Sequence, residues 1–249
     1  MENKTPRCIA YVILHYGAEY LREALLSVKD HVEKVVVLYT PSGSQGHATD
    51  IPPIESRDEL QKICHDTLGE QLIWVDGTWT HEAHHREAVY GYTQGYDVLI
   101  NVDADEIYNQ TDISVAIQEV FEGTARYRTV NGFRNLWKSF YHEAVDFFRP
   151  VRFVNLNADN TIQQEIMCRI YHFSCAQDIK TIEYKWNISG HKDELRPDWF
   201  DIYKNWSTEN RIKWLHPVSV TVWEEAIPFN PQEMPLFMRE HKNYSKEVI

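Results

Sequence analysis

No apolar run in the sequence approaches the roughly 20 residues that a transmembrane helix needs. The first 14 residues, MENKTPRCIAYVIL, have too short an apolar segment for a signal peptide and show no cleavage site. Cysteine is also scarce: the four cysteines are scattered, form no C-x-x-C pair and are typical of reduced cytosolic thiols. We therefore expect a cytoplasmic protein without an integral membrane segment.

Positively charged residues are fewer than negatively charged residues. Lys and Arg number 25 against 37 Asp and Glu, which gives a formal net charge of −12. A broad nucleic-acid-binding face and a polybasic membrane contact both require clustered positive charge, so this balance disfavours them. Apolar residues are plentiful, at 43% of 249 residues. They allow a sizeable core, in one large domain or two small ones.

The first hundred residues alternate between short apolar runs, typical of buried strands, and segments with apolar residues at helical spacing. Ser56 and Glu59 form a capping box before the second helix, and Gly69 ends it. A loop rich in Gly, Ser and Pro is predicted over 40–49. This β-α-β-α-β-α-β order predicts an α/β protein with a mostly parallel sheet flanked by helices. The predicted strands are Cys8–Leu14, Val35–Tyr39, Gln71–Val75 and the run from Val98, and the predicted helices include Glu19–Val28 and His81–Gln94.

The stretch Val98–Tyr108, VLINVDADEIY, carries the strongest chemical signal. An apolar strand leads into Asp103-Ala104-Asp105-Glu106 at its carboxyl end, where ligands of open α/β sheets collect. In extended chain, alternate residues point to the same side. We therefore expect Asp103 and Asp105 to converge on one hard cation, Mg²⁺ or Mn²⁺, while Ala104 points away.

An Arg-bearing helix followed by a strand that ends in D-x-D-E resembles the GT-A glycosyltransferases, especially family-2-like members. Arg86, in HHREAVYGYTQGYDVLINVDADE, holds the place of the family's arginine. The resemblance covers roughly Cys8–Tyr108. It implies a Rossmann-like GT-A fold, a nucleotide-diphosphate-sugar donor (UDP- or GDP-linked), Mn²⁺ or Mg²⁺, and transfer of a hexosyl or pentosyl group. Many members carry a base-contacting acid after the second strand, where this chain has Thr40-Pro41-Ser42-Gly43.

The resemblance also implies a single domain, 1–249, whose two halves have different roles. Residues 1–125 are expected to form the nucleotide-sugar-binding half, and 126–249 the acceptor half with a carboxyl-terminal wrap. The acceptor is left open among a glycan, a protein, a lipid and a modified nucleobase. The donor-binding residues that we infer are Arg86, Asp103, Tyr16 in the turn after the first strand, and Lys180 in a predicted helix over Asp178–Ile188.

Metal-dependent GT-A enzymes often take a third metal ligand, commonly His, from the carboxyl-terminal half. His172, in the predicted strand Cys168–Phe173, is our first choice beside Asp103 and Asp105. His216 is the second choice and His191 the third, and a purely structural role is the alternative for each. The metal would act as a Lewis acid on the leaving nucleoside diphosphate, with Glu106 orienting the site from behind.

The catalytic residues that we infer are Asp105 and one carboxylate that acts as a base toward the acceptor hydroxyl. The sequence does not choose between the candidates for that base, which are Asp178, Asp193, Glu194, Asp198 and Asp201. The aromatic and basic segment from Phe133 to Phe153 is a candidate acceptor side, with core packing as the alternative.

Two other functions fit parts of the sequence. His81-Glu82-Ala83-His84-His85 matches H-E-x-x-H, the pattern of zinc hydrolases in which both His share a helix face and Glu82 acts as base. The extended H-x-x-G-x-x-H continuation is absent. The other alternative is a non-catalytic protein of the same fold that binds a nucleotide sugar or carbohydrate.

Overall fold

The first apolar runs of the sequence form four adjacent parallel strands. The strands β1 (Cys8–Leu14) and β2 (Lys34–Tyr39) pair in register, β3 (Leu72–Asp76) lies on the far side of β2, and β4 (Val98–Asn101) lies beside β1. The computed structural model describes residues 5–43 and 51–249. Residues 44–50 of the loop predicted over 40–49 therefore lie outside the described residues. The predicted alternation of strands and helices is confirmed for this half of the chain.

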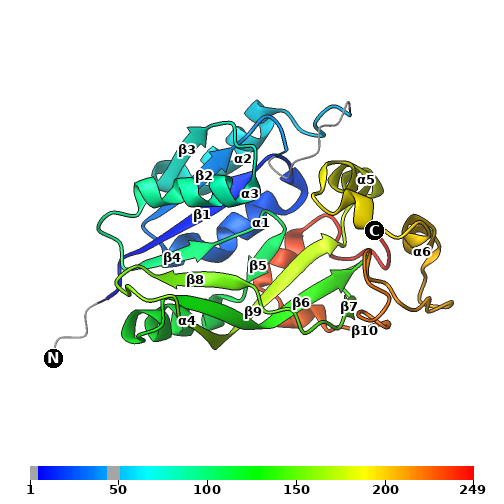
Figure 1. Ribbon diagram of the computed structural model, residues 1–249. Coiled ribbons are helices and arrows are strands. Elements are labelled where there is room, and N and C mark those ends of the chain that lie inside the picture. Colours follow the sequence, from blue (N-terminus) through cyan, green and yellow to red (C-terminus); the bar gives the residue numbers. More distant parts are fainter. Residues whose placement is uncertain (1–4, 44–50) are drawn as a thin grey trace.

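Helices cover both faces of this parallel unit (Figure 1). The helices α1 (Ala18–Val28), α2 (Arg57–Leu68) and α4 (Gln110–Glu122) pack with Ala10, Val12 and Leu14 of β1 in the largest core cluster. On the opposite face, Ile9 and Tyr11 pack in a second cluster with Val89, which follows α3 (Glu82–Glu87). Burial on both faces is the physical reason why these strands read as continuous apolar runs.

Ser56 caps α2, as half of the predicted capping box, and the predicted third helix is shorter than expected. Ser56 Oγ accepts a hydrogen bond from the backbone N–H of Glu59 at 3.2 Å, and Gly69 ends α2 with a φ of 53°. The segment predicted as one helix over His81–Gln94 instead forms the short α3 and a 3-10 helix, Ala88–Tyr92. Gly91 and the bulky tyrosines in GYTQGY have poor helix propensity, which accounts for the early end.

The carboxyl-terminal half extends the sheet with mainly antiparallel pairs. The strand β8 (Val151–Asn155) runs antiparallel to β4, and β6 (Tyr127–Trp137) lies between β8 and the long β9 (Gln163–Cys175). The short β5 (Glu106–Tyr108) pairs with β9 near its carboxyl end. The strands β7 (His142–Ala144) and β10 (Ala226–Pro228) complete this side. The sheet is thus parallel in its first half and mixed overall.

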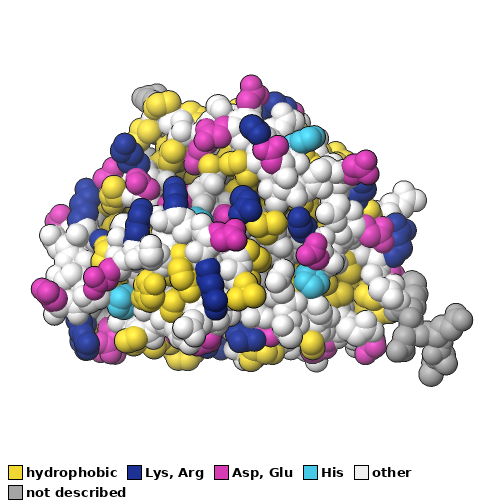
Figure 2. Space-filling view, turned by 180° about the vertical axis from the view of Figure 1, so that it is seen from behind, with side chains coloured by type: hydrophobic (Ala, Val, Ile, Leu, Met, Phe, Trp, Pro, Cys, Tyr) yellow, Lys and Arg dark blue, Asp and Glu magenta, His cyan; other side chains and the backbone are white. Residues whose placement is uncertain are grey.

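Two further helices lie beyond the carboxyl ends of the parallel strands, α5 (Ile179–Ile188) and α6 (Trp199–Asn205) (Figure 1). Trp137 and Trp199 centre an aromatic cluster that joins α5 and α6 to the end of β6. The carboxyl-terminal segment returns to α1, where a ring nitrogen of His241 lies 2.8 Å from the carbonyl oxygen of Glu19. None of the helices described is both long enough and apolar enough to cross a membrane. Acidic and basic side chains are interspersed over the face seen from behind (Figure 2).

Candidate functional site

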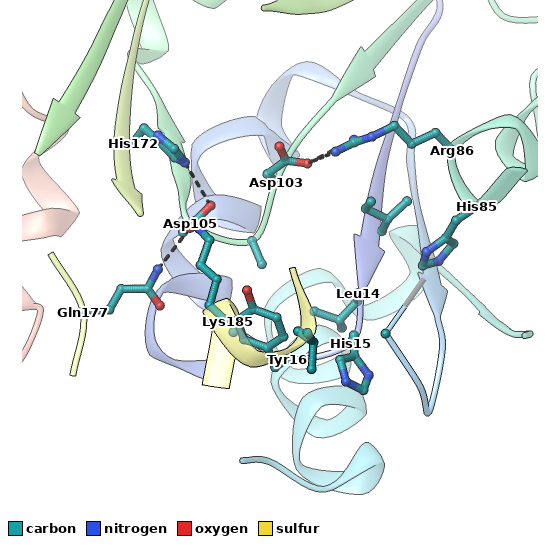
Figure 3. A pocket seen from close by; sticks show the side chains of 15 residues that line it. Leu14, His15, Tyr16, His85, Arg86, Asp103, Asp105, His172, Gln177 and Lys185 are labelled. Atoms are coloured by element: carbon teal, nitrogen blue, oxygen red, sulfur yellow. Dashed lines mark hydrogen bonds and ion pairs between the residues drawn. The ribbon is translucent and has the colours of Figure 1, made fainter. Parts of the chain in front are cut away.

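A cavity of about 170 Å³ opens at the carboxyl edge of the parallel strands, next to α5 (Figure 3). This volume is below the roughly 300–1,000 Å³ of sites that enclose a drug-sized ligand. The size of the cavity, as the described residues form it, therefore suits phosphate groups and a cation better than a whole nucleotide sugar. The lining residues that carry chemistry are His15, Tyr16, His85, Arg86, Asp103, Asp105, His172, Gln177 and Lys185.

The predicted acid pair lies in a turn and not in extended chain. The strand β4 ends at Asn101, and the backbone N–H of Glu106 donates to the carbonyl of Asp103 at 3.0 Å before β5 begins. Asp103 and Asp105 still both line the cavity. The expectation that Ala104 points away is wrong, because Ala104 also lines the cavity and faces the position that a Cβ on Gly17 would take.

Asp103 is held by two arginines. One carboxylate oxygen accepts from Arg86 at 3.1 Å, and the other accepts from Arg152 of β8 at 3.0 Å. Arg152 also forms a bidentate pair with the fully buried Glu106. Burial raises the pKa of Asp103, but the two guanidinium groups outweigh it and hold that pKa well below its usual range. Asp103 is therefore an anionic anchor for two cations.

Asp105 is the acid that faces the other cavity groups. Its Oδ2 accepts from the side-chain amide of Gln177 at 3.0 Å and lies 3.5 Å from Nζ of Lys185. Its Oδ1 lies 3.6 Å from Nε2 of His172, which is too long for a hydrogen bond. The close-up shows His172, Gln177 and Lys185 arranged around this carboxylate (Figure 3).

His172 presents an acceptor toward Asp105. Its Nδ1 lies 2.8 Å from the amide oxygen of Asn135, and because that oxygen only accepts, the ring proton sits on Nδ1. Nε2 then carries a lone pair. Burial lowers the pKa of His172 to about 4, so the ring is neutral at neutral pH although Asp105 opposes the shift. Two acceptors thus face each other across 3.6 Å, an arrangement that a shared cation stabilises.

Lys185 supplies a positive charge beside Asp105. Its ammonium donates to Oγ of Ser174 at 2.7 Å. Burial lowers the pKa of Lys185, but Asp105, Tyr16 and Cys175 together raise it by more, so the group stays charged at neutral pH. With Arg86 on the opposite wall, the cavity has one long cationic side chain on each side (Figure 3).

An aromatic wall follows β1. Nε2 of His15 lies 2.7 Å from the hydroxyl of Tyr184, and the ring of Tyr16 packs edge-on against Tyr184 at 5.4 Å between centroids. Tyr16 lines the cavity. Behind it, the carboxylate of Glu55 accepts from the backbone N–H groups of Gly17 and Ala18. The amino terminus of α1 is thus already occupied by an anion and does not offer a phosphate cradle.

Three predicted site residues lie outside the cavity. Asp178 caps α5 by accepting from the backbone N–H of Lys180, and it does not line the cavity. Lys180 is exposed on the outer side of α5, and Asp193 is exposed in the 3-10 helix Lys192–Glu194. Asp178 and Asp193, predicted as base, and Lys180, predicted to bind the donor, thus lie outside this cavity, whereas Lys185 of α5 lines it.

The other histidines considered for the third ligand are engaged away from the cavity. Nδ1 of His216 accepts from the backbone N–H groups of Val218 and Ser219. The imidazole of His191 lies 3.0 Å from the carboxylate of Glu194 at the surface. Of the three candidates, only His172 lines the cavity.

The H-E-x-x-H segment does not form a zinc site. His81 precedes α3 in extended conformation, so it does not share a helix face with His85. His85 is buried, stacks on Trp79 at 4.2 Å between ring centroids, and uses Nε2 to bond the carbonyl of Leu38. Over residues 5–43 and 51–249, no group of three or more His, Cys, Asp or Glu side chains is placed to hold a metal. The predicted trio of Asp103, Asp105 and His172 likewise does not form such a group.

Sequence reasoning missed Arg152, Gln177 and His15, and it preferred Lys180 to Lys185. The helical spacing of the apolar residues in this segment favours Lys185 over Lys180 as the residue that points inward. Lys185 lies three residues after the buried Ile182 and three before the buried Ile188, and Lys180 lies about 140° around the helix from it. Nothing local marks Arg152 or Gln177, whose partners lie 49 and 72 residues away.

No protein-family model and no curated protein matches the chain. Similar solved structures include a mannosyltransferase from Pyrobaculum calidifontis in complex with GDP-Man and Mn²⁺, at 17% identity over 52% of this chain and 36% of that one, with a TM-score of 0.40. S. aureus TarS is 14% identical over 60% of this chain and 47% of that one, with a TM-score of 0.39. The chain thus spans less than half the length of these two proteins.

A nucleotidyltransferase appears beside these glycosyltransferases. The inositol-1-phosphate CTP transferase from T. maritima is 12% identical over 74% of this chain and 97% of that one, with a TM-score of 0.41. All three likenesses concern the fold.

Proposed function

We propose that this protein is a glycosyltransferase that binds the diphosphate of a nucleotide-sugar donor in the cavity beside Asp105. The observation that carries the proposal is the pair of acceptors on Asp105 and His172, 3.6 Å apart and flanked by the charged Lys185. Side chains that converge in this way at the carboxyl edge of parallel strands are typical of a phosphate and cation site.

The donor set suits Mn²⁺ or Mg²⁺ with Asp105 and His172 as protein ligands. Neighbouring ligands of an octahedral ion lie about 3 Å apart, near the observed separation, and such ions usually complete their shell with phosphate oxygens and water. The Nδ1–H of His172 donates to Asn135, the type of partner that fixes a ligating histidine. Asp103, with both oxygens on arginines, is not part of this pair. When bound, the cation would act as a Lewis acid on the diphosphate.

The chain's own cations complete the charge balance for a diphosphate. Asp103 and Asp105 offset Arg86 and Lys185 among the lining residues, and Arg152 behind Asp103 is offset by Glu106. A divalent cation therefore makes the cavity net positive, as a diphosphate requires. Arg86, fixed by Glu82, Asn101 and Asp103, presents its guanidinium without needing to be ordered on binding.

We assign the surrounding residues by their positions. Gln177 and Lys185 hold the carboxylate of Asp105 toward the cavity, and Tyr16 and His15 form an aromatic wall beside it. Among the residues that the structure describes, Asp103 and Asp105 are the carboxylates that line the cavity. Because Asp103 is anchored, Asp105 is the carboxylate available to the reacting groups. A UDP- or GDP-linked sugar remains the donor class that we expect.

The test is a thermal-shift screen of UDP-, GDP-, CDP-, ADP- and dTDP-sugars with and without Mn²⁺. A ligand that binds only the folded chain raises the midpoint by mass action. We expect one nucleotide sugar to raise it with Mn²⁺ present, and Asp105→Asn and His172→Ala to remove the Mn²⁺-dependent part. If no nucleotide sugar binds, or both variants respond as the wild type does, the proposal is wrong.

Turnover separates the transferase from a non-catalytic binder of the same fold. A transferase hydrolyses its donor slowly when no acceptor is present, because water can take the acceptor's place. We expect chromatography of the selected donor after long incubation to show free nucleoside diphosphate, and Asp105→Asn to prevent its release. Binding without any hydrolysis would favour the binder.

A further inference from the structure

The loop between β7 and β8 exposes two adjacent aromatic side chains. Phe147 is 80% exposed and Phe148 is 55% exposed, and Val145 nearby is 47% exposed. Exposed apolar residues are ordinary when they are scattered, but a contiguous group commonly marks a binding surface. The sequence V-D-F-F-R-P places this group directly before β8.

The loop is held in place by hydrogen bonds. Oδ1 of Asp146 accepts from the backbone N–H groups of Phe147 at 2.6 Å and Phe148 at 3.1 Å. Oδ2 of the same side chain lies 3.4 Å from the amide nitrogen of Asn135, which contacts His172 through its oxygen. These hydrogen bonds fix the backbone of the loop, and in this conformation the two phenylalanine side chains are exposed.

Register and ring contacts connect this loop to the candidate site. Ile100 of β4 pairs with Phe153 of the antiparallel β8, so the segment before β8 lies at the same sheet edge as the turn of Asp103 and Asp105. The ring of Phe148 packs edge-on against Phe133 at 5.9 Å between centroids, and Phe133 lies 5.0 Å from the ring of His172. The two phenylalanines thus form a rim beside the cavity.

We propose that Phe147 and Phe148 form a platform for a neutral saccharide acceptor, an inference that rests on the proposed function. The C–H faces of a pyranose ring pack on aromatic rings, while its hydroxyls need polar neighbours. The polar neighbours are Glu165, Arg149 and Asn131. The carboxylate of Glu165 accepts a hydrogen bond from Arg149 at 3.2 Å and one from Asn131 at 2.9 Å. Arg149 and Glu165 are a charge-balanced pair and Asp146 adds a negative charge, so the rim has no excess positive charge for a polyanion or an anionic membrane.

The experiment uses the full chain and four neutral probes: maltohexaose, cellohexaose, chitohexaose and mannohexaose. Binding is measured by ligand-observed NMR titration, and the midpoint of thermal unfolding verifies that each variant is folded. We expect at least one probe to bind at millimolar concentration, and Phe147→Ala and Phe148→Ala each to weaken it about tenfold, or about 1.4 kcal/mol. Leu236→Ala removes another exposed apolar side chain, 70% exposed, outside this rim and should change nothing.

The proposal is overturned if none of the four probes binds, or if the double variant Phe147→Ala, Phe148→Ala binds them as the wild type does. Co-flotation with phosphatidylcholine vesicles that the double variant loses would also overturn it, in favour of a lipid contact. Nucleotide-sugar binding is measured on the same samples and should be unchanged in the double variant. If saccharide binding depends on the two phenylalanines but no nucleotide sugar binds, the platform stands and the proposed function fails.

Discussion

Asp105 and His172 face each other because two strands meet in a fixed register. Glu106 of β5 pairs with His172 of β9, and the backbone N–H of Phe173 donates to the carbonyl of Asp105 at 2.9 Å. This pairing places Oδ1 of Asp105 3.6 Å from Nε2 of His172, although 66 residues separate the two along the chain. The pairing of β5 with β9 thus sets the geometry of the proposed cation site.

The two lysines of α5 provide a matched test of the phosphate assignment. Lys185→Met removes the ammonium beside Asp105, so we expect it to weaken Mn²⁺-dependent binding of UDP or GDP by about tenfold, the scale of one charge-assisted hydrogen bond. Lys180→Met, on the exposed side of the same helix, should have no effect. Isothermal titration measures both. Equal losses in the two variants would indicate a general charge effect and exclude a specific contact.

Asp103 is expected to matter for stability. Asp103→Asn leaves Arg86 and Arg152 with weaker partners and should lower the free energy of unfolding by about 1.5–3 kcal/mol at neutral pH, the scale of a hydrogen bond to a charged group. Because the pKa of Asp103 is depressed in the folded state, its contribution is present above the unfolded pKa of about 3.9 and is lost as the pH falls below it. Urea unfolding at several pH values should therefore show the difference shrinking in acid. A difference that stays constant down to pH 3 would contradict the assigned ion pairs.

The histidines of the H-E-x-x-H segment should behave as structural and surface residues. His85→Ala removes a buried ring from Trp79 and its bond to Leu38, so we expect a loss of about 1–3 kcal/mol in the free energy of unfolding. His81→Ala, at an exposed position, should be nearly neutral. Metal analysis of the purified protein provides the second measurement. Stoichiometric zinc that both variants lose would restore the zinc hydrolase interpretation.

Gly17 should resist substitution because its backbone and its neighbour both require glycine. Its φ is +124°, and an added Cβ would lie 3.0 Å from Cβ of Ala104. We expect Gly17→Ala to cost about 1–3 kcal/mol, the scale of a residue held in a sparsely populated conformation. Adding Ala104→Gly should recover only the part due to the contact. Gly91→Ala, where an added Cβ meets nothing within 4 Å, is the control, and chemical denaturation of the three variants measures the costs.

Local pattern was sufficient for the elements of the parallel half. The apolar runs fixed β1 to β4 to within a residue or two, because burial on both faces leaves a signature in consecutive residues. The cap at Ser56 and the stop at Gly69 were equally local. The sequence also located Arg86, Asp103, Asp105 and Tyr16 at one edge of the sheet, since the ends of parallel strands meet there.

Tertiary structure decided how those residues are used. Arg152 reaches Asp103 from a strand 49 residues later, which makes Asp103 an anchor and leaves Asp105 to face His172. The docking of α5 selects Lys185 over Lys180, and the fold of the turn brings Ala104 inward. The chemistry of a residue indicates from the sequence whether its side chain is buried. It does not indicate which other side chains that residue contacts. Those depend on strand register and helix rotation, which are set by the packing of the whole core.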